Sequence, residues 1–380
     1  MLFLSRPLVF AVAIATFLIT PTADAATIDT KAEQAIIVDF QTGAVLMAKN
    51  ADQQMPTSSM SKVISMYAVF DALKSGDLTL ESELMVSEKA WRMGGSKMFV
   101  EVGKKAKVED LIRGVIVQSG NDATIVLAEG LAGTEDAFAK LLNNKAKTIG
   151  MENSNFVNAS GWPDENHYST ARDLSKLGRA LITNFPEYYS YYAEEEFTYS
   201  DITQKNRNPL LYRDIGADGI KTGHTEAAGY GLIGSGVQDE RRVVLVVNGL
   251  DSAKARAEES SRLLEWALKN FDNKTFFAAN ATVAQADVTM GKASTVTLVT
   301  QEDVLATVPK FDTAEIKVEA VYQKPLIAPV KKGQEVGTLK ISIPDQEPLE
   351  TPLYAGEDVP ELGFVAQAVA KIKHLLVAGT

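Results

Sequence analysis

The 380-residue sequence contains no cysteine and only three histidines. Without cysteine the chain can form no disulfide bond, no thiolate nucleophile and no zinc–thiolate site. A three-histidine metal site would need His167, His224 and His374 together, and the last of these lies at the extreme C-terminus. We therefore expect neither a metal nor a cofactor. A Ser-His-Asp triad through His167 or His224 stays open at this point.

Basic residues are also scarce relative to acidic ones. The sequence has 38 Lys and Arg against 49 Asp and Glu, which gives a formal net charge of −11. This balance disfavours a nucleic-acid partner and a cationic surface that coats a membrane. An apolar content of 46% is ordinary for a globular protein, and a chain of this length predicts two domains.

The N-terminal residues carry a short apolar run instead of a full membrane span. Residues 8–19 are apolar, Arg6 precedes them, and residues 23–25 form a small-x-small sequence. This arrangement is typical of a cleaved signal peptide, and the run is short for a membrane anchor. We predict a signal peptide at residues 1–25, cleavage after Ala25 and an exported mature protein.

The segment 56–67 carries the first chemical motif, a Ser-x-x-Lys formed by Ser59 and Lys62. Pro56 and the hydroxyl residues after it are helix-start signals, and an apolar helical pattern follows. Residues three apart share one helix face, so a neutral Lys62 can take the hydroxyl proton of Ser59. A capped helix with a solvated lysine is the alternative, because a single match of this kind is weak.

The first 272 residues contain both helical and strand-like segments. Strands are expected at 35–48, 218–225 and 230–250, and helices at 108–117, 122–129, 134–149, 169–182 and 253–271. Ser119, Gly120 and Asn121 lie between two of these helices. A glycine there breaks the helix, so Ser119 and Asn121 can project into a cleft.

The secondary-structure pattern that the sequence predicts changes near residue 273. Short alternating strands, punctuated by glycine and proline, predict a small all-β domain at 273–358 with a structural or docking role. Residues 359–380 place apolar side chains on one face but are too polar to span a bilayer. We expect an amphipathic helix that lies in the membrane interface; a helix packed on the β domain is the alternative.

Three short motifs follow one another along the chain. They are Ser59-x-x-Lys62, Ser119-Gly120-Asn121 and Lys221-Thr222-Gly223. This ordered set occurs in penicillin-binding proteins and class A β-lactamases. The joint match is far more specific than any one motif alone.

Cleavage of an amide needs an activated oxygen, an oxyanion hole and a proton for the leaving amine. Ser59 can supply the oxygen, and Lys62 can be the base if burial and a second cation, Lys221, destabilise its ammonium. Ser119 can carry a proton towards the leaving nitrogen, and Asn121 can orient a substrate amide.

The third motif is expected to hold the substrate. Gly223 would let an edge strand approach a substrate backbone closely, because glycine has no side chain in the way. Lys221 and Thr222 would then face a substrate carboxylate.

The whole mature chain resembles the low-molecular-mass penicillin-binding proteins, which are serine-type D-alanyl-D-alanine carboxypeptidases of the S11 type. Besides the three motifs, the resemblance rests on segments 119–122, 202–208, 219–225 and 256–266. It implies an α+β penicillin-binding/β-lactamase-like transpeptidase domain, an antiparallel sheet flanked by helices, at 26–272. The all-β domain and the amphipathic helix would match the family's C-terminal domain and membrane anchor.

The resemblance also implies roles for single residues. Ser59 would be acylated by a peptidoglycan stem pentapeptide, releasing D-alanine, and by β-lactams as covalent inhibitors. The N–H groups of Ser59 and His224 would form the oxyanion hole, and Arg207 with Thr222 would bind the terminal carboxylate. The enzyme would be anchored at the periplasmic face of the inner membrane. Ser160 departs from relatives that carry histidine before the following glycine.

Several alternatives stay open. A serine β-lactamase would use a loop carboxylate, such as Asp164 or Glu165, to activate the deacylating water, but has no use for the β domain. A peptidoglycan DD-endopeptidase would share the motifs. A Ser-His-Asp hydrolase and a cell-wall binding module with an inactive site are the others. The carboxypeptidase is favoured, because every motif residue is present and the match extends over the whole mature chain.

Overall fold

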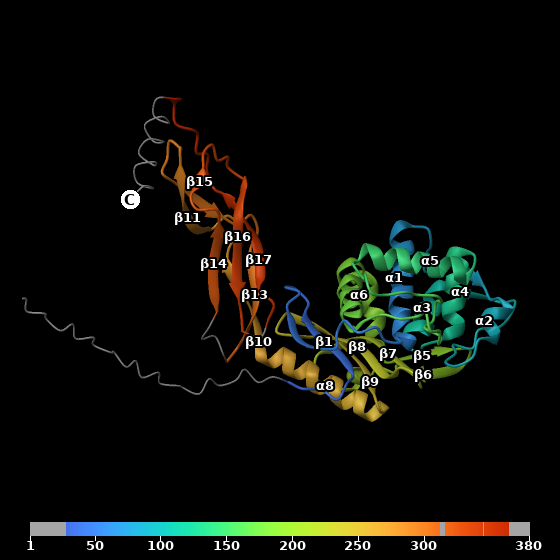
Figure 1. The fold of residues 1–380 in the computed structure, drawn as a ribbon. Coiled ribbons are helices and arrows are strands. Elements are labelled where there is room, and N and C mark those ends of the chain that lie inside the picture. Colours follow the sequence, from blue (N-terminus) through green and yellow to red (C-terminus); the bar gives the residue numbers. More distant parts are fainter. Residues whose placement is uncertain (1–27, 312–315, 345, 365–380) are drawn as a thin grey trace, which may run out of the picture.

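The structure is a computed structural model, which describes residues 28–311, 316–344 and 346–364. The predicted signal peptide at 1–25 lies outside the described residues. The described chain forms a helix-and-sheet domain, followed by a separate, elongated all-β domain (Figure 1).

A five-stranded antiparallel sheet forms the centre of the first domain, in the order β2-β1-β9-β8-β7. The strands are β1 (Gln34–Asp39), β2 (Val45–Lys49), β7 (Ala217–Thr225), β8 (Gly229–Gln238) and β9 (Arg241–Leu250). The sequence predicts these strands because turn residues bound them, and β1 and β9 are also rich in β-branched side chains. The order makes β7, which carries the third motif, an edge strand.

The central sheet is buried on both faces. Along β1, Ile36 belongs to one apolar cluster and Ile37 to another, because successive side chains point to opposite faces. Val244 and Leu245 divide in the same way on β9. The helix α8 (Ala253–Asn270) covers one face and the helical lobe covers the other (Figure 1).

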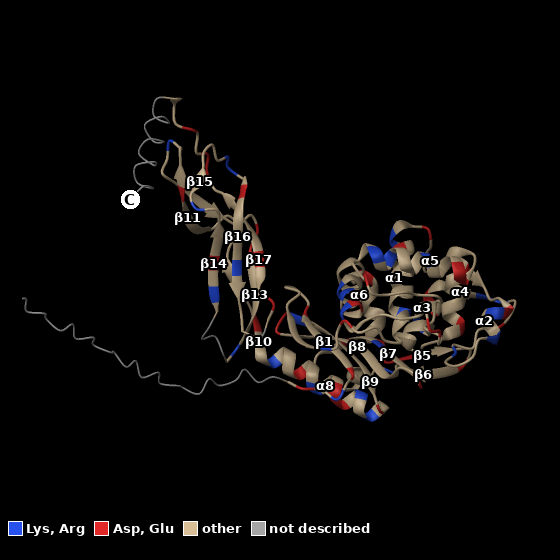
Figure 2. Ribbon diagram, in the orientation of Figure 1, with Lys and Arg blue, Asp and Glu red and all other residues tan. Residues whose placement is uncertain are grey.

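The helical lobe is built around α1 (Lys62–Ser75), in which eleven residues are buried. Around it lie α2 (Glu88–Arg92), α3 (Val108–Ile116), α4 (Asn121–Ala132), α5 (Glu135–Thr148), α6 (Ala171–Asn184) and α7 (Pro186–Tyr189). Short elements complete the domain: β3 (Glu83–Met85), β4 (Lys105–Lys107), β5 (Glu196–Tyr199), β6 (Ile202–Lys205), η2 (Ser190–Ala193) and η3 (Pro209–Tyr212). Acidic and basic residues alternate along α8 and over the helices (Figure 2).

The structure corrects the predicted start of the helix at Ser59. Residues Ser58–Ser61 form a short 3₁₀ helix, η1, and the α-helix begins only at Lys62. A 3₁₀ helix has three residues per turn, so side chains at positions i and i+3 are stacked on one side. The tighter turn therefore brings Ser59 and Lys62 together more directly than an α-helix would.

The C-terminal domain is a β structure with its own apolar core. A six-stranded sheet has the order β14-β16-β17-β12-β11-β15, and β10 pairs with β13. The strands are β10 (Phe271–Phe277), β11 (Thr282–Thr289), β12 (Thr295–Val299), β13 (Val304–Pro309), β14 (Lys317–Tyr322), β15 (Leu326–Ile327), β16 (Glu335–Ser342) and β17 (Leu349–Ala355). Phe271, predicted as the last residue of the preceding helix, begins β10 instead.

The predicted C-terminal helix does not begin at Val359. Val359 forms a β-bridge with Val330, and Glu361 forms one with Gly291, so this segment is extended. Backbone hydrogen bonds to the β domain replace those of a first helical turn. Residues 365–380, which hold most of the predicted helix, lie outside the described residues.

Polar contacts join the two domains next to the end of α8. The hydroxyl groups of Thr42 and Thr307 lie 2.6 Å apart, and Asn273 Nδ2 donates to Asp39 Oδ1 at 3.2 Å. Asp39 is fully buried and pairs with Arg241 at 2.9 Å. The loop after β1 therefore contacts the β domain away from the three motifs.

Candidate active site

Ser59 and Lys62 meet at the junction of η1 and α1. Lys62 Nζ donates to Ser59 Oγ at 2.8 Å, to Asn121 Oδ1 at 2.7 Å and to the Ser160 carbonyl at 2.9 Å. Lys62 is completely buried and Ser59 is partly exposed. A lysine that extends from the first turn of a buried helix therefore holds the serine hydroxyl at the edge of the protein interior.

The protonation of Lys62 is strongly affected by its surroundings. Burial, with a smaller contribution from the Arg207 guanidinium, lowers the pKa of Lys62 from 10.5 to about 7, while Asp122 opposes the shift. A charged ammonium loses hydration on burial, so the neutral amine is favoured. The neighbouring cation that lowers this pKa is Arg207, where the sequence suggests Lys221. Burial and the charge of Lys62 instead hold the pKa of Lys221 well below its ordinary value.

The second motif occupies the turn between α3 and α4, as the sequence predicts. Ser119 has a left-handed backbone, with φ of 58°, and is buried. Asn121 begins α4 and spans the site: its Oδ1 accepts from Lys62 and its Nδ2 donates to the Gly94 carbonyl at 2.8 Å. The turn thus brings Asn121 into contact with Lys62, and the role of Ser119 stays a prediction.

Asp122 supports this turn, although it lies outside the three motifs. Its fully buried carboxylate accepts hydrogen bonds from the N–H groups of Met98 (2.8 Å), Phe99 (2.8 Å) and Ala123 (2.9 Å). Charge-assisted bonds of this kind are strong and fix backbone geometry. A buried acid directly after the motif is the sequence signal that indicates this role.

The third motif lies on β7, against η1. Lys221, Thr222 and Gly223 are all buried. A side chain at Gly223 would place its Cβ 2.2 Å from Ser58 Oγ and 2.9 Å from the Thr57 carbonyl oxygen. The sequence predicts that this glycine makes room for a substrate backbone. That role stays a prediction, and the structure shows that this glycine also lets the strand pack against the segment that carries Ser59.

Arg207 and His224 lie at the exposed rim of the site. Arg207 follows β6 and donates to the Ser96 hydroxyl, and its charge lowers the pKa of both Lys62 and Lys221. The His224 ring stacks on Tyr230, with centroids 3.9 Å apart. The roles that the family resemblance implies for Arg207 and His224 stay predictions.

His167 is engaged with Ser61, and not with Ser59. Its Nε2 lies 2.8 Å from Ser61 Oγ, and its Nδ1 accepts from the Val157 N–H at 3.3 Å. Ser61 Oγ also contacts Thr57 Oγ1 at 2.5 Å. Burial lowers the pKa of His167 to about 4, so the ring is neutral at pH 7. The contacts of His167 therefore do not support a Ser-His-Asp triad through this residue.

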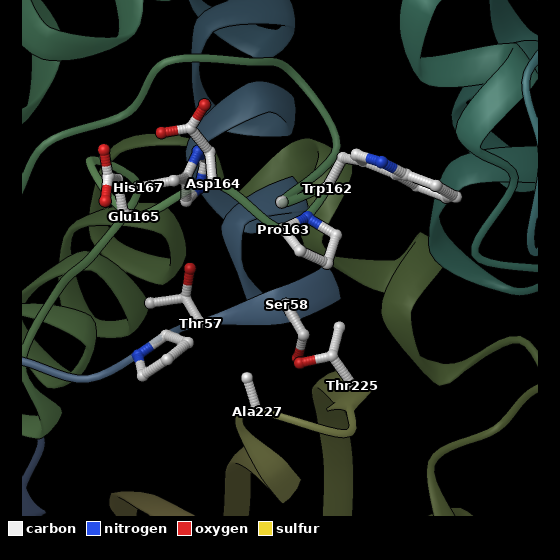
Figure 3. Close-up of a pocket in the computed structure, with 11 residues that line it drawn as sticks. Thr57, Ser58, Trp162, Pro163, Asp164, Glu165, His167, Thr225 and Ala227 are labelled. Atoms are coloured by element: carbon white, nitrogen blue, oxygen red, sulfur yellow. The ribbon is translucent and has the colours of Figure 1, made fainter.

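A cavity of about 350 Å³ opens next to Ser59, on the side of η1 that faces the end of β7. Figure 3 shows Asp164, Glu165 and His167 on one side and Thr225 and Ala227 on the other, with η1 between them. The complete lining is Pro56, Thr57, Ser58, Gly161, Trp162, Pro163, Asp164, Glu165, His167, Thr225 and Ala227. Over the residues that the structure describes, no group of three or more His, Asp or Glu is placed to hold a metal ion.

Two family models match the chain in sequence order. One, described as D-alanyl-D-alanine carboxypeptidase of peptidase family S11, matches residues 20–252. The other, described as the C-terminal domain of penicillin-binding protein 5, matches residues 271–361. Together the two matches extend over both domains of the structure.

Individual relatives agree. D-alanyl-D-alanine carboxypeptidase DacC of Escherichia coli (strain K12) is 38% identical over 361 residues, which cover 92% of this chain and 90% of the relative. The crystal structure of penicillin-binding protein 5 from Haemophilus influenzae superposes with a TM-score of 0.78 at 36% identity, over 88% of this chain and 98% of that one.

A third relative has been solved with a β-lactam. Penicillin-binding protein D2 from Listeria monocytogenes, in its ampicillin-bound form, has a TM-score of 0.59 and 30% identity over 64% of this chain and 99% of that chain. The matches confirm the predicted fold, with its helix-and-sheet domain and C-terminal β domain. The chain belongs to the S11 family of D-alanyl-D-alanine carboxypeptidases.

Proposed function

We propose that this protein is a serine-type D-alanyl-D-alanine carboxypeptidase that removes the terminal D-alanine from peptidoglycan stem peptides. The observation that carries the proposal is the contact between Lys62 Nζ and Ser59 Oγ, made by a buried lysine whose pKa is about 7. A neutral amine at this distance can accept the hydroxyl proton without a histidine. Family membership supplies the substrate class.

The reaction follows from these positions. Ser59 Oγ bonds to the carbonyl carbon of the penultimate D-alanine while its proton passes to Lys62 Nζ. The C–N bond then breaks, and the leaving nitrogen receives a proton through the hydroxyl of Ser119. Water next attacks the ester and gives its proton to Lys62, and Ser59 leaves as the hydroxyl. Lys62 thus serves both half-reactions.

The remaining motif residues bind the substrate. Thr222, Lys221 and Arg207 form the proposed site for the terminal carboxylate, because Arg207 is cationic and close enough to lower the pKa of Lys221. The N–H groups of Ser59 and His224 form the oxyanion hole. Asn121, already oriented by Lys62 and Gly94, orients the substrate amide. Gly223 acts through the close packing of β7 on η1.

The test is release of D-alanine from a pentapeptide that ends in D-Ala-D-Ala. The wild-type protein should release it, and Ser59→Ala should release none. Release by Ser59→Ala would contradict the assignment of the nucleophile. Absence of release by the wild type would leave the inactive binding module as the better explanation.

Product analysis on cross-linked muropeptides separates the carboxypeptidase from a DD-endopeptidase. Free D-alanine supports the proposal, whereas cleaved cross-links without free D-alanine support the endopeptidase.

β-Lactams are proposed as covalent inhibitors that acylate Ser59. The ampicillin-bound relative supports this proposal. A labelled penicillin should give a slowly released, stoichiometric adduct, absent in Ser59→Ala. Hydrolysis at many turnovers per second would identify a β-lactamase instead. Asp164 and Glu165 are exposed, and Asp164 Oδ1 accepts a hydrogen bond from the Asn166 N–H.

The relatives are enzymes of the bacterial cell wall, which agrees with an extracytoplasmic location. We further propose a signal peptide at 1–25, a catalytic domain at 26–272, a β domain at 273–358 and an amphipathic anchor within 359–380 on the periplasmic face of the inner membrane. Among the described residues, no helix is long and apolar enough to cross a bilayer. Deletion of 359–380 should release the protein from membranes while D-alanine release persists; a deleted protein that stays bound would refute the anchor.

A further inference from the structure

Arg256 is a buried cation that the reaction described above does not use. It lies in the first turn of α8, it is only 9% exposed, and its Nε makes no hydrogen bond within the described part of the chain. Burial lowers the pKa of Arg256 to about 10, Tyr230 raises it and Arg207 lowers it further, so the guanidinium stays charged at pH 7. Among the described residues no carboxylate affects this pKa. A buried cation without an anion costs stability, so stability alone does not explain an arginine at this position.

The guanidinium contacts β7 at the third motif. Its Nη1 donates to the Gly223 carbonyl oxygen at 3.3 Å. Its central carbon lies 5.5 Å from the centroid of the Tyr230 ring, and the His224 ring stacks on that same ring with centroids 3.9 Å apart. Arg256 therefore holds the backbone at Gly223 directly and supports the next residue, His224, through Tyr230.

The Gly223 carbonyl and the His224 N–H are the two ends of one peptide group. This peptide bond is trans, so its two ends point in opposite directions. The inference rests on the proposed function, in which the His224 N–H is one donor of the oxyanion hole. A cation bonded to the carbonyl oxygen draws electron density away from the nitrogen, so the N–H becomes a stronger donor. The same bond fixes the plane of the peptide group, and with it the direction of the N–H.

We propose that Arg256 is a positioning residue of the oxyanion hole, which orients and polarises the peptide group between Gly223 and His224 without touching the substrate. During acylation a negative charge develops on the scissile carbonyl oxygen, and a fixed cation behind the donor stabilises that charge. Water screens the charge of Arg256 little, because the guanidinium is buried.

Arg256→Met tests this role, because methionine is unbranched and apolar but carries neither a charge nor an N–H donor. Single-turnover kinetics with a labelled penicillin separate the dissociation constant of the first complex from the acylation rate constant. The rate constant should fall roughly tenfold, which is less than the loss of a whole oxyanion donor costs. The dissociation constant should change much less, because Arg256 does not touch the ligand. Arg256→Lys keeps a cation and should recover part of the rate.

A matched control is Lys254→Met, which removes an exposed cation from the same turn of α8. This variant should keep the wild-type acylation rate. Arg256→Gln, which keeps an N–H donor but no charge, is a second neutral variant and should slow acylation as Arg256→Met does. It decides the test if Arg256→Met fails to fold.

Infrared spectroscopy of the acyl-enzyme measures the strength of the oxyanion hole. The penicilloyl ester on Ser59 places its carbonyl oxygen in the hole, where strong donors lower its stretching frequency. An isotopic label at the carbonyl carbon identifies the band. The frequency should rise in Arg256→Met and Arg256→Gln, return part of the way in Arg256→Lys and stay unchanged in Lys254→Met. Only acylated molecules give this band, so an unfolded fraction of a variant does not contribute.

An acylation rate that is unchanged in the neutral variants would overturn the proposal. A slower rate with an unchanged carbonyl frequency would also overturn it, because Arg256 would then serve only the packing of α8 on the sheet. An adduct that still forms in Ser59→Ala, or no adduct in the wild type, would contradict the proposed function itself.

Discussion

Acylation of Ser59 should depend on pH through the protonation of Lys62, with a midpoint near pH 7. Burial and the charge of Arg207 lower the pKa of Lys62 from 10.5 to about 7. With this pKa about half of the lysine is neutral at pH 7, about a tenth at pH 6 and about a hundredth at pH 5. At the ordinary pKa only about one molecule in 3,000 would be neutral at pH 7. The difference corresponds to about 5 kcal/mol of destabilised ammonium.

The assay is single-turnover acylation by a fluorescent penicillin between pH 5 and 9. Two variants should move the midpoint in opposite directions. Arg207→Gln removes a cation that lowers the pKa of Lys62, so the midpoint should rise; Asp122→Asn removes an anion that raises it, so the midpoint should fall. Arg213→Gln, which removes an exposed arginine, is the control and should leave the midpoint unchanged.

The midpoint is the measured quantity, because it is independent of how tightly each variant binds the penicillin carboxylate. An acylation rate that is flat from pH 5 to 8, or that still rises tenfold per pH unit at pH 9, would refute Lys62 as a neutral base. Shifts of the same sign in Arg207→Gln and Asp122→Asn would refute the electrostatic explanation.

Three further predictions concern the groups that support the site. His167→Gln should make the free energy of unfolding less sensitive to acid. In the folded protein the pKa of His167 is about 4, below its ordinary value of 6.5. The free energy of unfolding of the wild type should therefore fall by about 3 kcal/mol as the pH decreases from 6.5 to 4. Urea unfolding at both pH values measures this, and an equal loss in the variant would contradict it. Gly223→Ala should slow acylation more than tenfold, because the added Cβ would displace the η1 segment. Gly363→Ala, at a position with open space around it, is the control. An unchanged acylation rate in Gly223→Ala would contradict the packing argument. Asp122→Asn should lower the free energy of unfolding by about 3 kcal/mol, since one of its acceptor oxygens becomes a donor facing backbone N–H groups; unchanged urea unfolding would show that these bonds contribute little.

The sequence predicts much of the fold because its local signals agree with the tertiary structure. The hairpin after residue 34, the helix from Val108 and the strands around the turn at 238–241 all form where the periodicity and turn residues place them. Element ends are less certain, because packing decides them. Phe271 pairs with Pro309 in the β domain instead of ending α8, and Val359 pairs with Val330 instead of beginning a helix.

For the candidate site, too, the sequence predicts some features and only the tertiary structure shows the others. The motifs by themselves identify Ser59, Lys62 and Asn121, because each residue type has a defined part in acyl transfer. No spacing in the sequence shows that Arg207 lies near enough to Lys62 to lower its pKa, or that Gly223 packs on Ser58. Those relations join segments more than a hundred residues apart, and only the folded chain brings them together.

The cavity next to Ser59 depends still more on tertiary structure. Its walls come from η1, from the loop 161–167 and from the end of β7, three segments that share no sequence signal. Sequence alone therefore indicated the family and the candidate reacting groups, because covalent chemistry restricts residue types. Tertiary structure decided the surroundings that lower the pKa of Lys62 and the shape of the neighbouring cavity, because burial, charge and empty volume depend on distances that a linear sequence does not contain.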